Sequence, residues 1–418
     1  MQPNPSTRRS LLILLAGIVA FIALLSFTVG WALPLVIFTI IFIVMAHEFG
    51  HFITAKRAGM KVTDFFVGFG PVLWSTTIGE TRYGVRAILA GGYVKVPGMN
   101  WTEDIPADEE ARTYRSASYP RKALFASAGS IMHLIMALLL AWAALTFVGL
   151  PSQDHVGVGA FAKWPGHAQD AAQAAGLKAG DRIMAIDGRP MTSDALLIST
   201  VEKSSGQRLT LLVNRDGHTI TLHATPVDGR TIKSGSGFLA TGAKAHGYLG
   251  ITLVDLPVRD SWYAAIPSSF TEVGSLVGTA ATAIVHVFSP GEFSSLFHQV
   301  ASPAAANNPT NQRTRPESIV GVVRIAVQST STGPGDLLLI LMAVNIFVGI
   351  LNMLPMLPLD GGYVAIATYE RIRSRRGRRY EADLNKMAPF AYAFMGVLLV
   401  LFACTLYLDI VHPIANPF

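Results

Sequence analysis

Two histidines and a glutamate stand together in the stretch AHEFGHFITAKR, residues 46–57. His47 and His51 are four residues apart, so on a helix they share one face and can bind the same metal ion. Glu48 lies beside them, placed to take a proton from water held by that metal. The pattern predicts hydrolytic metal chemistry, with two histidine ligands and a glutamate as general base.

The motif closes a long apolar stretch. Residues 11–46 carry no charged side chain, and one helix of that length would measure roughly 54 Å at ~1.5 Å per residue. The hydrocarbon core of a bilayer is only ~30 Å thick. Gly30 and Pro34 therefore divide the run, since glycine weakens a helix and proline suits the first turn of the next one. We expect membrane helices near 10–30 and 33–56, with a signal segment as the alternative for the first.

Three further uncharged runs are long enough for membrane helices. They lie at residues 123–149, 337–354 and 389–410. The segments that we place on one side of the membrane hold 19 Lys and Arg against 10 Asp and Glu; they are residues 1–9, 56–122 and 369–386. Residues 150–336 hold 14 of each kind. Because basic flanks favour the cytoplasm, we expect the N-terminus inside and residues 150–336 outside.

Two features limit which molecules the chain is expected to bind and which kinds of metal site it can form. The arginine-rich run 371–379 lies close to a predicted membrane helix, which favours lipid headgroups as its partner and argues against nucleic acid. Cys404 is the only cysteine, which excludes an internal disulfide and a zinc site built from cysteines.

The histidine motif lies inside the predicted bilayer. Its helix enters from outside, so His47 is about 21 Å deep at ~1.5 Å per residue, nearer the cytoplasmic face. Three ionisable groups within a membrane helix are costly, and they indicate a functional site. The alternative is a polar cluster between helices whose members satisfy one another.

A catalytic zinc ion usually has three protein ligands, and the motif helix supplies two. The stretch NMLPMLPLDGG, residues 352–362, ends the uncharged run from Leu337 at Asp360, and Pro355 and Pro358 break the helix there. Since this helix also enters from outside, Asp360 reaches the depth of His47 and is the candidate third ligand. The alternative is an ordinary helix end that emerges into water, capped by the aspartate.

These motifs resemble those of the site-two protease family, in particular the bacterial members that cleave membrane-bound anti-sigma factors. The matching parts are His-Glu-x-x-His at 47–51, Asn-x-x-Pro at 352–355 and Leu-Asp-Gly at 359–361. The order of parts matches from about Trp31 onwards. The resemblance implies a bacterial plasma-membrane protein that uses Zn²⁺. It implies His47, His51 and Asp360 as ligands, Glu48 as general base, and Asn352 as the residue that positions the substrate carbonyl or stabilises the oxyanion.

Residues 58–120 resemble the family's cytoplasmic membrane-associated hairpin in FFVGFGP and GGYVKVPGM. Alternation over residues 83–96 predicts a β-hairpin against the membrane. Its free edge is expected to hold an unwound substrate strand by main-chain hydrogen bonds. The residues expected there are Gly91, Gly92, Tyr93 and Val94. The alternative is a closed structural hairpin, and the acidic patch 102–112 is expected to be a solvated loop.

One motif departs from the family. The stretch SAGSIMH, residues 127–133, stands where the family often has Gly-Pro-x-x-Asn, which puts a polar role there in doubt. We interpret His133 as a chance interfacial residue rather than an extra polar contact.

The outside segment resembles a PDZ domain over residues 155–255, chiefly in AGLKAGDRIMAIDGRPM at 175–191. Residues 208–226 read as two alternating strands around Asp216–Gly217, a hairpin signal. GYLGI at 247–251 resembles a carboxylate-binding loop, with a plain strand as the alternative. PDZ domains bind extended peptides by adding a strand. Because no metal or nucleophile constellation lies in this module, we expect it to restrict access.

Residues 262–288 mix apolar residues with Ser and Thr and are expected to lie flat on the outer leaflet. Residues 302–318 are rich in Pro, Asn and Thr, which predicts a linker.

The sequence thus predicts a polytopic α-helical membrane protein with about five transmembrane helices, an extracytoplasmic α+β PDZ domain and a cytoplasmic β-hairpin. The parts are 1–57, 58–120, 121–150, 155–255, 260–333 and 334–418. The predicted function is zinc-dependent intramembrane endopeptidase, acting within the bilayer on a single-pass protein already trimmed outside, such as an anti-sigma factor. Two alternatives are a PDZ-bearing membrane scaffold with a structural or inactive zinc site, and an ion-coupled transporter. The paired histidines with Glu48 argue against both.

Overall fold

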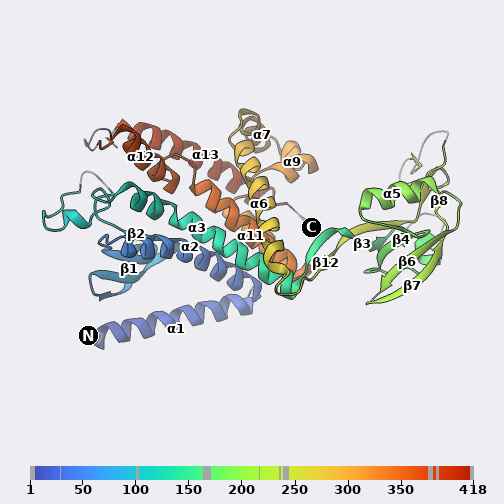
Figure 1. Ribbon diagram of the computed structural model, residues 1–418, viewed down its shortest axis with the longest axis horizontal. Coiled ribbons are helices and arrows are strands. Elements are labelled where there is room, and N and C mark those ends of the chain that lie inside the picture. The colour runs from blue at the N-terminus through green and yellow to red at the C-terminus, as the bar shows by residue number, and fades with distance from the viewer. Residues whose placement is uncertain are drawn as a thin grey trace. The chain divides into compact units, whose positions relative to one another are not determined.

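The computed structural model describes residues 5–28, 30–99, 103–162, 171–215, 217–234, 237–238, 244–374, 380–382 and 386–414. The chain divides into two compact units. The helical unit comprises Met1–Ala141 and Ser268–Phe418, and the β unit comprises Trp142–Pro267. Figure 1 shows the long helices in the first unit and most of the strands in the second.

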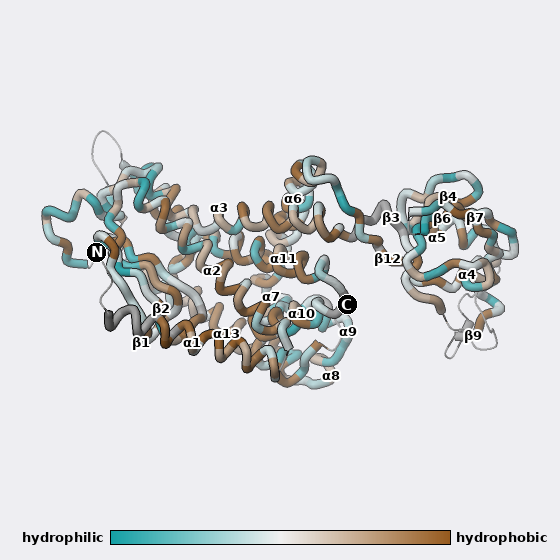
Figure 2. The backbone as a smooth tube through the Cα atoms, turned by 90° about the horizontal axis from the view of Figure 1, so that it is seen from below, coloured by the Kyte–Doolittle hydropathy of each residue, from teal (hydrophilic) through white to brown (hydrophobic). Residues whose placement is uncertain are grey.

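The five segments predicted as membrane helices are all helical. They are α1 (Pro5–Thr28), α2 (Ala32–Arg57), α3 (Tyr119–Ala143, continued by a π turn over Ala144–Val148), α11 (Pro334–Asn352) and α13 (Ala388–Val411). The predicted division of the first apolar run falls where expected, since Gly30 separates α1 from α2 with a φ of +97° that glycine tolerates. Figure 2 shows hydrophobic residues along α2, α11 and α13.

Among the described residues, five helices are long and apolar enough to cross a membrane, which defines a polytopic membrane protein. They are α2, α3 with its continuation, α6 (Ala265–Val287), α11 and α13. The set includes α6, which was expected to lie flat. It does not include α1, whose residues Leu15–Thr28 form an apolar helix shorter than the five. Hydroxyl groups of Thr279 and Thr282 donate back to helix carbonyls, so α6 is less polar than its composition suggests. The flat placement of this segment stays a prediction.

The segment between α2 and α3 forms the predicted hairpin from β1 (Asp64–Ile78) and β2 (Thr81–Lys95). The hairpin is curled, because Phe66 lies opposite both Gly84 and Tyr93. The segment 92–95 therefore pairs with the start of β1. A short 3₁₀ turn, Glu110–Arg112, follows in the acidic patch.

The prediction of a linker over residues 302–318 is wrong. The segment between α6 and α11 is helical: α7 (Pro290–Ala301), α8 (Pro303–Ala306), α9 (Pro309–Thr314) and α10 (Ile319–Thr332). The prolines and asparagines that suggested a linker serve as helix starts. Asn308 caps α9 with its side chain, and proline occupies the first turn, where its missing N–H has no cost.

The β unit contains a sheet in the order β12, β3, β4, β6, β7, with β5 paired to β4. Its elements are β3 (Leu150–Phe161), α4 (Ala171–Ala174), β4 (Arg182–Ile186), β5 (Arg189–Pro190), α5 (Asp194–Lys203), β6 (Leu209–Arg215), β7 (His218–Ala224) and β12 (Ile251–Val258). Short elements are β8 (Val227–Asp228), a 3₁₀ turn (Gly229–Thr231), β9 (Lys233–Ser234), β10 (Gly237–Phe238) and β11 (Gly247–Tyr248).

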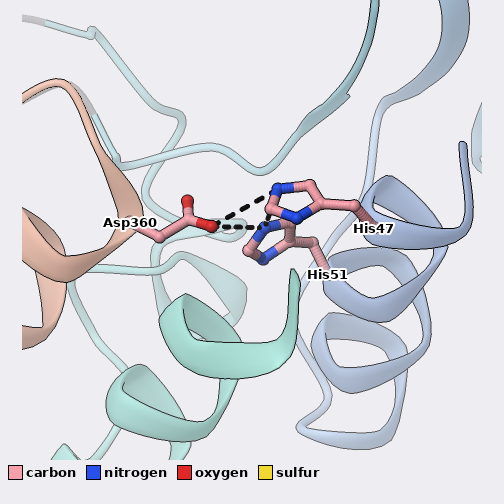
Figure 3. Close-up of side chains that lie close together, drawn as sticks. All are labelled: His47, His51 and Asp360. Atoms are coloured by element: carbon pink, nitrogen blue, oxygen red, sulfur yellow. Dashed lines mark hydrogen bonds and ion pairs between the residues drawn. The ribbon is translucent and has the colours of Figure 1, made fainter. Parts of the chain in front are cut away.

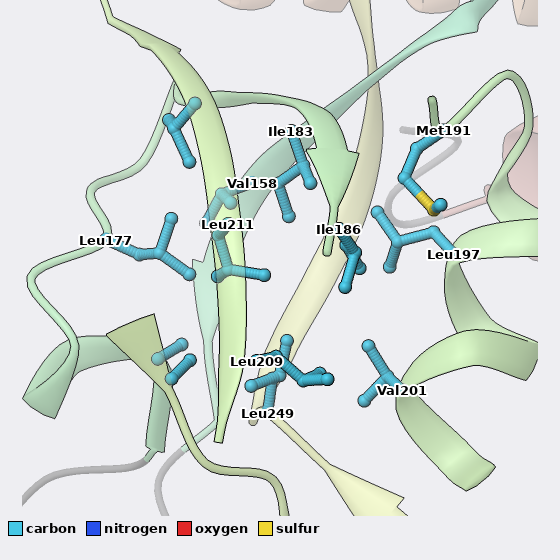
Figure 4. Packing of buried hydrophobic residues seen from close by; sticks show 13 residues of the cluster. Val158, Leu177, Ile183, Ile186, Met191, Leu197, Val201, Leu209, Leu211 and Leu249 are labelled. Carbon is cyan, nitrogen blue, oxygen red and sulfur yellow. The ribbon is translucent and has the colours of Figure 1, made fainter. Parts of the chain in front are cut away.

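The core of the β unit lies between the sheet and α5. Alternate residues of β6, Leu209 and Leu211, are buried against Leu197 and Val201 of the helix (Figure 4). The strands predicted around Asp216 are confirmed as β6 and β7, while position 216 itself lies outside the described residues.

Candidate metal centre

Three side chains from opposite ends of the chain meet in the helical unit (Figure 3). His47 and His51 lie on α2, and their Nε2 atoms are 3.2 Å apart. Asp360 is the first residue of α12 (Asp360–Arg373). This helix begins after the non-helical segment that follows the end of α11 at Asn352. Its Oδ2 lies 3.1 Å from Nε2 of His51 and 3.4 Å from Nε2 of His47. The predicted proximity of the three residues is confirmed.

The three donor atoms have the spacing that zinc requires. A tetrahedral zinc ion with bonds of about 2.0–2.1 Å keeps its ligand atoms roughly 3.3 Å apart, and the observed separations are 3.1, 3.2 and 3.4 Å. The Nδ1–H of His51 donates to the carbonyl of Phe125 over 2.8 Å, which leaves the Nε2 lone pair directed at Asp360. Among the described residues, these three form the His/Cys/Asp/Glu group that could hold a metal ion.

Helix α3 supports the two histidines from behind. A methyl group at Gly129 would collide with the His47 ring, so only glycine allows this helix to pass so close. The carbonyl of Phe125, one turn earlier, orients His51. Sequence reasoning missed both residues. The small residues around Gly129 were a signal for close packing, whereas the backbone carbonyl of Phe125 has no sequence signal.

Asn352 ends α11 inside the same cluster. Its Nδ2 donates to Oδ2 of Asp360 over 2.8 Å and lies 3.3 Å from Nε2 of His47. The structure thus places Asn352 beside the metal-ligand candidates, as predicted. Its hydrogen bond holds the carboxylate that would bind the metal, a position typical of a residue that orients a ligand.

His133 makes a specific polar contact, so its interpretation as a chance interfacial residue is wrong. Its Nδ1 lies 2.6 Å from Oδ1 of Asn345 on α11, and Asn345 Nδ2 donates to the His133 carbonyl over 2.6 Å. Its ring centre is 5.0 Å from that of His47. Asn345 is two helical turns before Asn352 and on the same face, so this contact fixes α11 against α3 next to the site.

Glu48 follows His47 on α2, and strand β2 passes close to its side chain. The Val94 N–H faces the Glu48 carboxylate. Gly92 packs so closely that a methyl group there would lie 2.9 Å from the Met45 sulfur and 3.1 Å from Cγ of Glu48. Two of the four hairpin residues predicted to bind a substrate strand, Gly92 and Val94, therefore adjoin the candidate general base.

Comparison with known proteins agrees with this geometry. The profile of Peptidase family M50 matches residues 35–397, and the chain belongs to this family. Zinc metalloprotease Rip1 of Mycobacterium tuberculosis is 32% identical over 398 residues, covering 89% of this chain and 95% of that protein.

Two more distant relatives come from photosynthetic organisms. A putative zinc metalloprotease of Nostoc is 28% identical over 337 residues, covering 80% of this chain and 84% of that protein. The chloroplastic membrane metalloprotease ARASP of Arabidopsis thaliana is 26% identical over 372 residues, covering 86% and 74%. The chain is therefore a multi-pass membrane zinc metalloprotease whose cofactor is Zn²⁺. The scaffold and transporter alternatives are not supported.

Proposed function

We propose that the chain is an intramembrane endopeptidase that hydrolyses a peptide bond in the transmembrane segment of a single-pass protein already trimmed outside, such as an anti-sigma factor. The observation that carries the proposal is where the site lies. His47, Glu48 and His51 stand in the second half of α2, a helix long and apolar enough to cross the membrane. A hydrolytic centre at that depth has membrane-embedded peptide bonds within its reach.

The residues divide the chemistry among them. His47, His51 and Asp360 would hold Zn²⁺, which when bound activates water and polarises a carbonyl. Glu48 takes the proton from the attacking water and passes it to the leaving amine. Asn352 keeps the Asp360 carboxylate in place. Its amide has the second proposed role of stabilising charge that develops on the substrate oxygen.

Substrate binding uses strand β2 in this proposal. A transmembrane helix must unwind before cleavage, because its amides are otherwise bonded within the helix. Gly92 and Val94 adjoin Glu48. With Gly91 and Tyr93 they are proposed to offer the main-chain groups that β1 does not use to an extended strand. The lack of a side chain at Gly92 lets this strand lie directly on the face of α2 that carries the general base.

The β unit is proposed to be an extracytoplasmic PDZ domain that restricts access. A cavity of about 430 Å³ lies between α5 and the segment that follows β11. Its apolar lining includes Leu197 and Val201 from the helix and Leu249 and Ile251 from the opposite side. A groove between a helix and a strand suits an extended peptide that adds alongside the strand.

The test of the proposed function uses two substrates: a single-pass protein with a short outer segment, and the same protein with a folded outer domain. The purified full-length chain should cut the short one within its transmembrane segment and leave the long one intact, with the cleaved bond identified by mass spectrometry. A cut found only outside the apolar segment would overturn the intramembrane assignment.

The access role of the β unit is tested with a deletion in the same assay. Gly157 and Val254 are partners in the β3–β12 ladder, so residues 158–253 can be replaced by a two-residue Asn-Gly turn. The shortened enzyme should still cut the short substrate and should now cut the long one. A folded deletion variant that fails on the short substrate would show a direct role in catalysis, and one that still rejects the long substrate would refute the access role.

Orientation is tested by cysteine labelling in a Cys404→Ser background. Thr192 in the β unit and Asp108 after the hairpin are both exposed. If the β unit is outside and the hairpin inside, a membrane-impermeant thiol reagent should label Thr192→Cys in intact cells and label Asp108→Cys only after permeabilisation. The reverse pattern would invert the proposed topology.

A further inference from the structure

A buried ion pair joins α3 to α12 on the hairpin side of the site. The Lys122 ammonium lies 2.9 Å from a carboxylate oxygen of Glu370, and the two side chains are 5% and 9% exposed. The residues are 248 positions apart in the chain. Burying two charges costs about as much free energy as their attraction returns, so such a pair is a weak source of stability. Its presence calls for another explanation.

The pair is completed by neighbours, so neither charge lacks partners. The second oxygen of Glu370 accepts the Ala382 N–H over 3.0 Å. The Lys122 ammonium lies 5.4 Å from the centre of the Tyr114 ring, within the range of a cation–π contact. One turn earlier on α3, the Tyr119 hydroxyl lies 3.4 Å from that of Thr368. These contacts therefore fix the position of α12 along the length of α3, which we call the register of the two helices.

That register matters because each helix carries one half of the metal centre. On α3, one turn after Lys122, the Phe125 carbonyl accepts the Nδ1–H of His51. On α12, the first residue is Asp360, whose carboxylate faces the Nε2 of His51. Any slide or tilt of α12 along α3 changes the distance between the aspartate and the histidines.

Aromatic packing transmits the same constraint. Tyr114 lies between the two helices, with ring-centre distances of 5.6 Å to Phe125 and 6.2 Å to Tyr363. Tyr363 is one turn after Asp360 on α12. Lys122 contacts this same Tyr114 ring, so the ion pair and the aromatic contacts act on one interface.

The two ends of α12 are held in different ways. At its start, methyl groups on Gly361 and Gly362 would collide with the backbone around Met353 and Met356, so close packing fixes the first turn. Glu370 lies ten residues beyond Asp360, which is about 15 Å along the helix axis. A restraint at that distance from the first turn limits the tilt of the whole helix.

We propose that Lys122 and Glu370 are positioning residues that hold α12 against α3, so that Asp360 faces His47 and His51 at zinc-binding distance. Neither residue touches the metal or the substrate. The inference rests on the proposed ligand set, because it assigns the pair a role in aligning those ligands.

The test is zinc affinity, measured on the full-length chain in detergent after the metal has been removed with a chelator. Lys122→Met and Glu370→Met should each bind zinc about 10-fold more weakly, the lower end of the loss typical of groups that orient metal ligands. Each single variant should also melt at a lower temperature, because it leaves one buried charge without its partner.

The double variant, Lys122→Met with Glu370→Met, separates positioning from stability. Replacing both charges by apolar side chains of similar length should restore the melting temperature. Zinc affinity should stay about 10-fold weaker than in the wild type, since the directed contact is still missing. Glu109→Gln is the matched control: it removes the Lys61–Glu109 pair at the surface of the same region and should leave zinc affinity unchanged.

A double variant that binds zinc as tightly as the wild type would reduce the pair to a structural role and overturn the proposal. Asp360→Ala is titrated in parallel. If that variant kept wild-type zinc affinity, the ligand set would fail rather than the positioning argument, so the two failures are distinguishable.

Discussion

Replacing Glu48 by glutamine is expected to abolish cleavage while leaving bound zinc in place. The amide has the same shape but cannot take a proton from water, and loss of a general base typically costs 10²-fold or more. The glutamine oxygen can still face the Val94 N–H, so the contact between α2 and β2 should persist. Cleavage of the short substrate and zinc content should be measured on the same preparation.

The control for this prediction is again Glu109→Gln, which changes a carboxylate of the same region that faces Lys61 instead of the site. It should cleave at the wild-type rate. A Glu48→Gln enzyme that retains wild-type activity would rule out Glu48 as the general base. Loss of zinc together with activity would instead mean that Glu48 helps to hold the metal.

The parts of the site that could be predicted are those whose chemistry depends on residue type and spacing. A four-residue interval places His47 and His51 on one helix face in any context. Asp360 could be proposed as a ligand because an acidic residue at membrane depth is costly and indicates a functional site. The two prolines before it break the helix at that depth. The structure brings these residues within 3.4 Å of one another, with Asn352 beside them.

The parts that could not be predicted depend on which segments pack together. The Phe125 carbonyl that orients His51 is a backbone group, and every residue has one. The pairing of Lys122 with Glu370 joins residues whose sequence separation leaves many possible partners. His133 was misread for the same reason, since its partner Asn345 lies in a helix whose rotation is set by packing.

The fold shows the same division. Long uncharged runs and alternating strands were predicted with useful boundaries, because hydrophobic burial imposes a period on each element. The helical segment at 302–318 was misjudged because proline ends one helix and starts another equally well, and the choice depends on what the segment packs against. Burial of Arg315 beside Asp409 of α13 is the kind of tertiary contact that decides it.

Removal of a metal ligand should produce a different failure from removal of Glu48. Asp360→Ala and His47→Ala are each expected to lose zinc affinity by more than about 100-fold, exceeding the 10–100-fold typical of residues that only orient ligands. Cleavage should disappear with the metal, because the remaining two donor atoms cannot hold the ion at ordinary zinc concentrations. Asn352→Ala, which keeps all three ligands but removes the hydrogen bond to Asp360 and the contact with His47, should weaken zinc binding by about 10-fold.

This graded series checks the assignment by zinc titration and by cleavage at saturating zinc. At saturation Asn352→Ala should bind a full equivalent of metal, so any loss of activity that persists reports on its second role at the substrate oxygen. Asp108→Ala, an exposed aspartate far from the ligands in sequence, should match the wild type throughout. Full zinc occupancy with normal cleavage in Asp360→Ala would remove Asp360 from the ligand set. The third zinc ligand would then have to be a residue other than Asp360, brought to the two histidines by a movement of the chain.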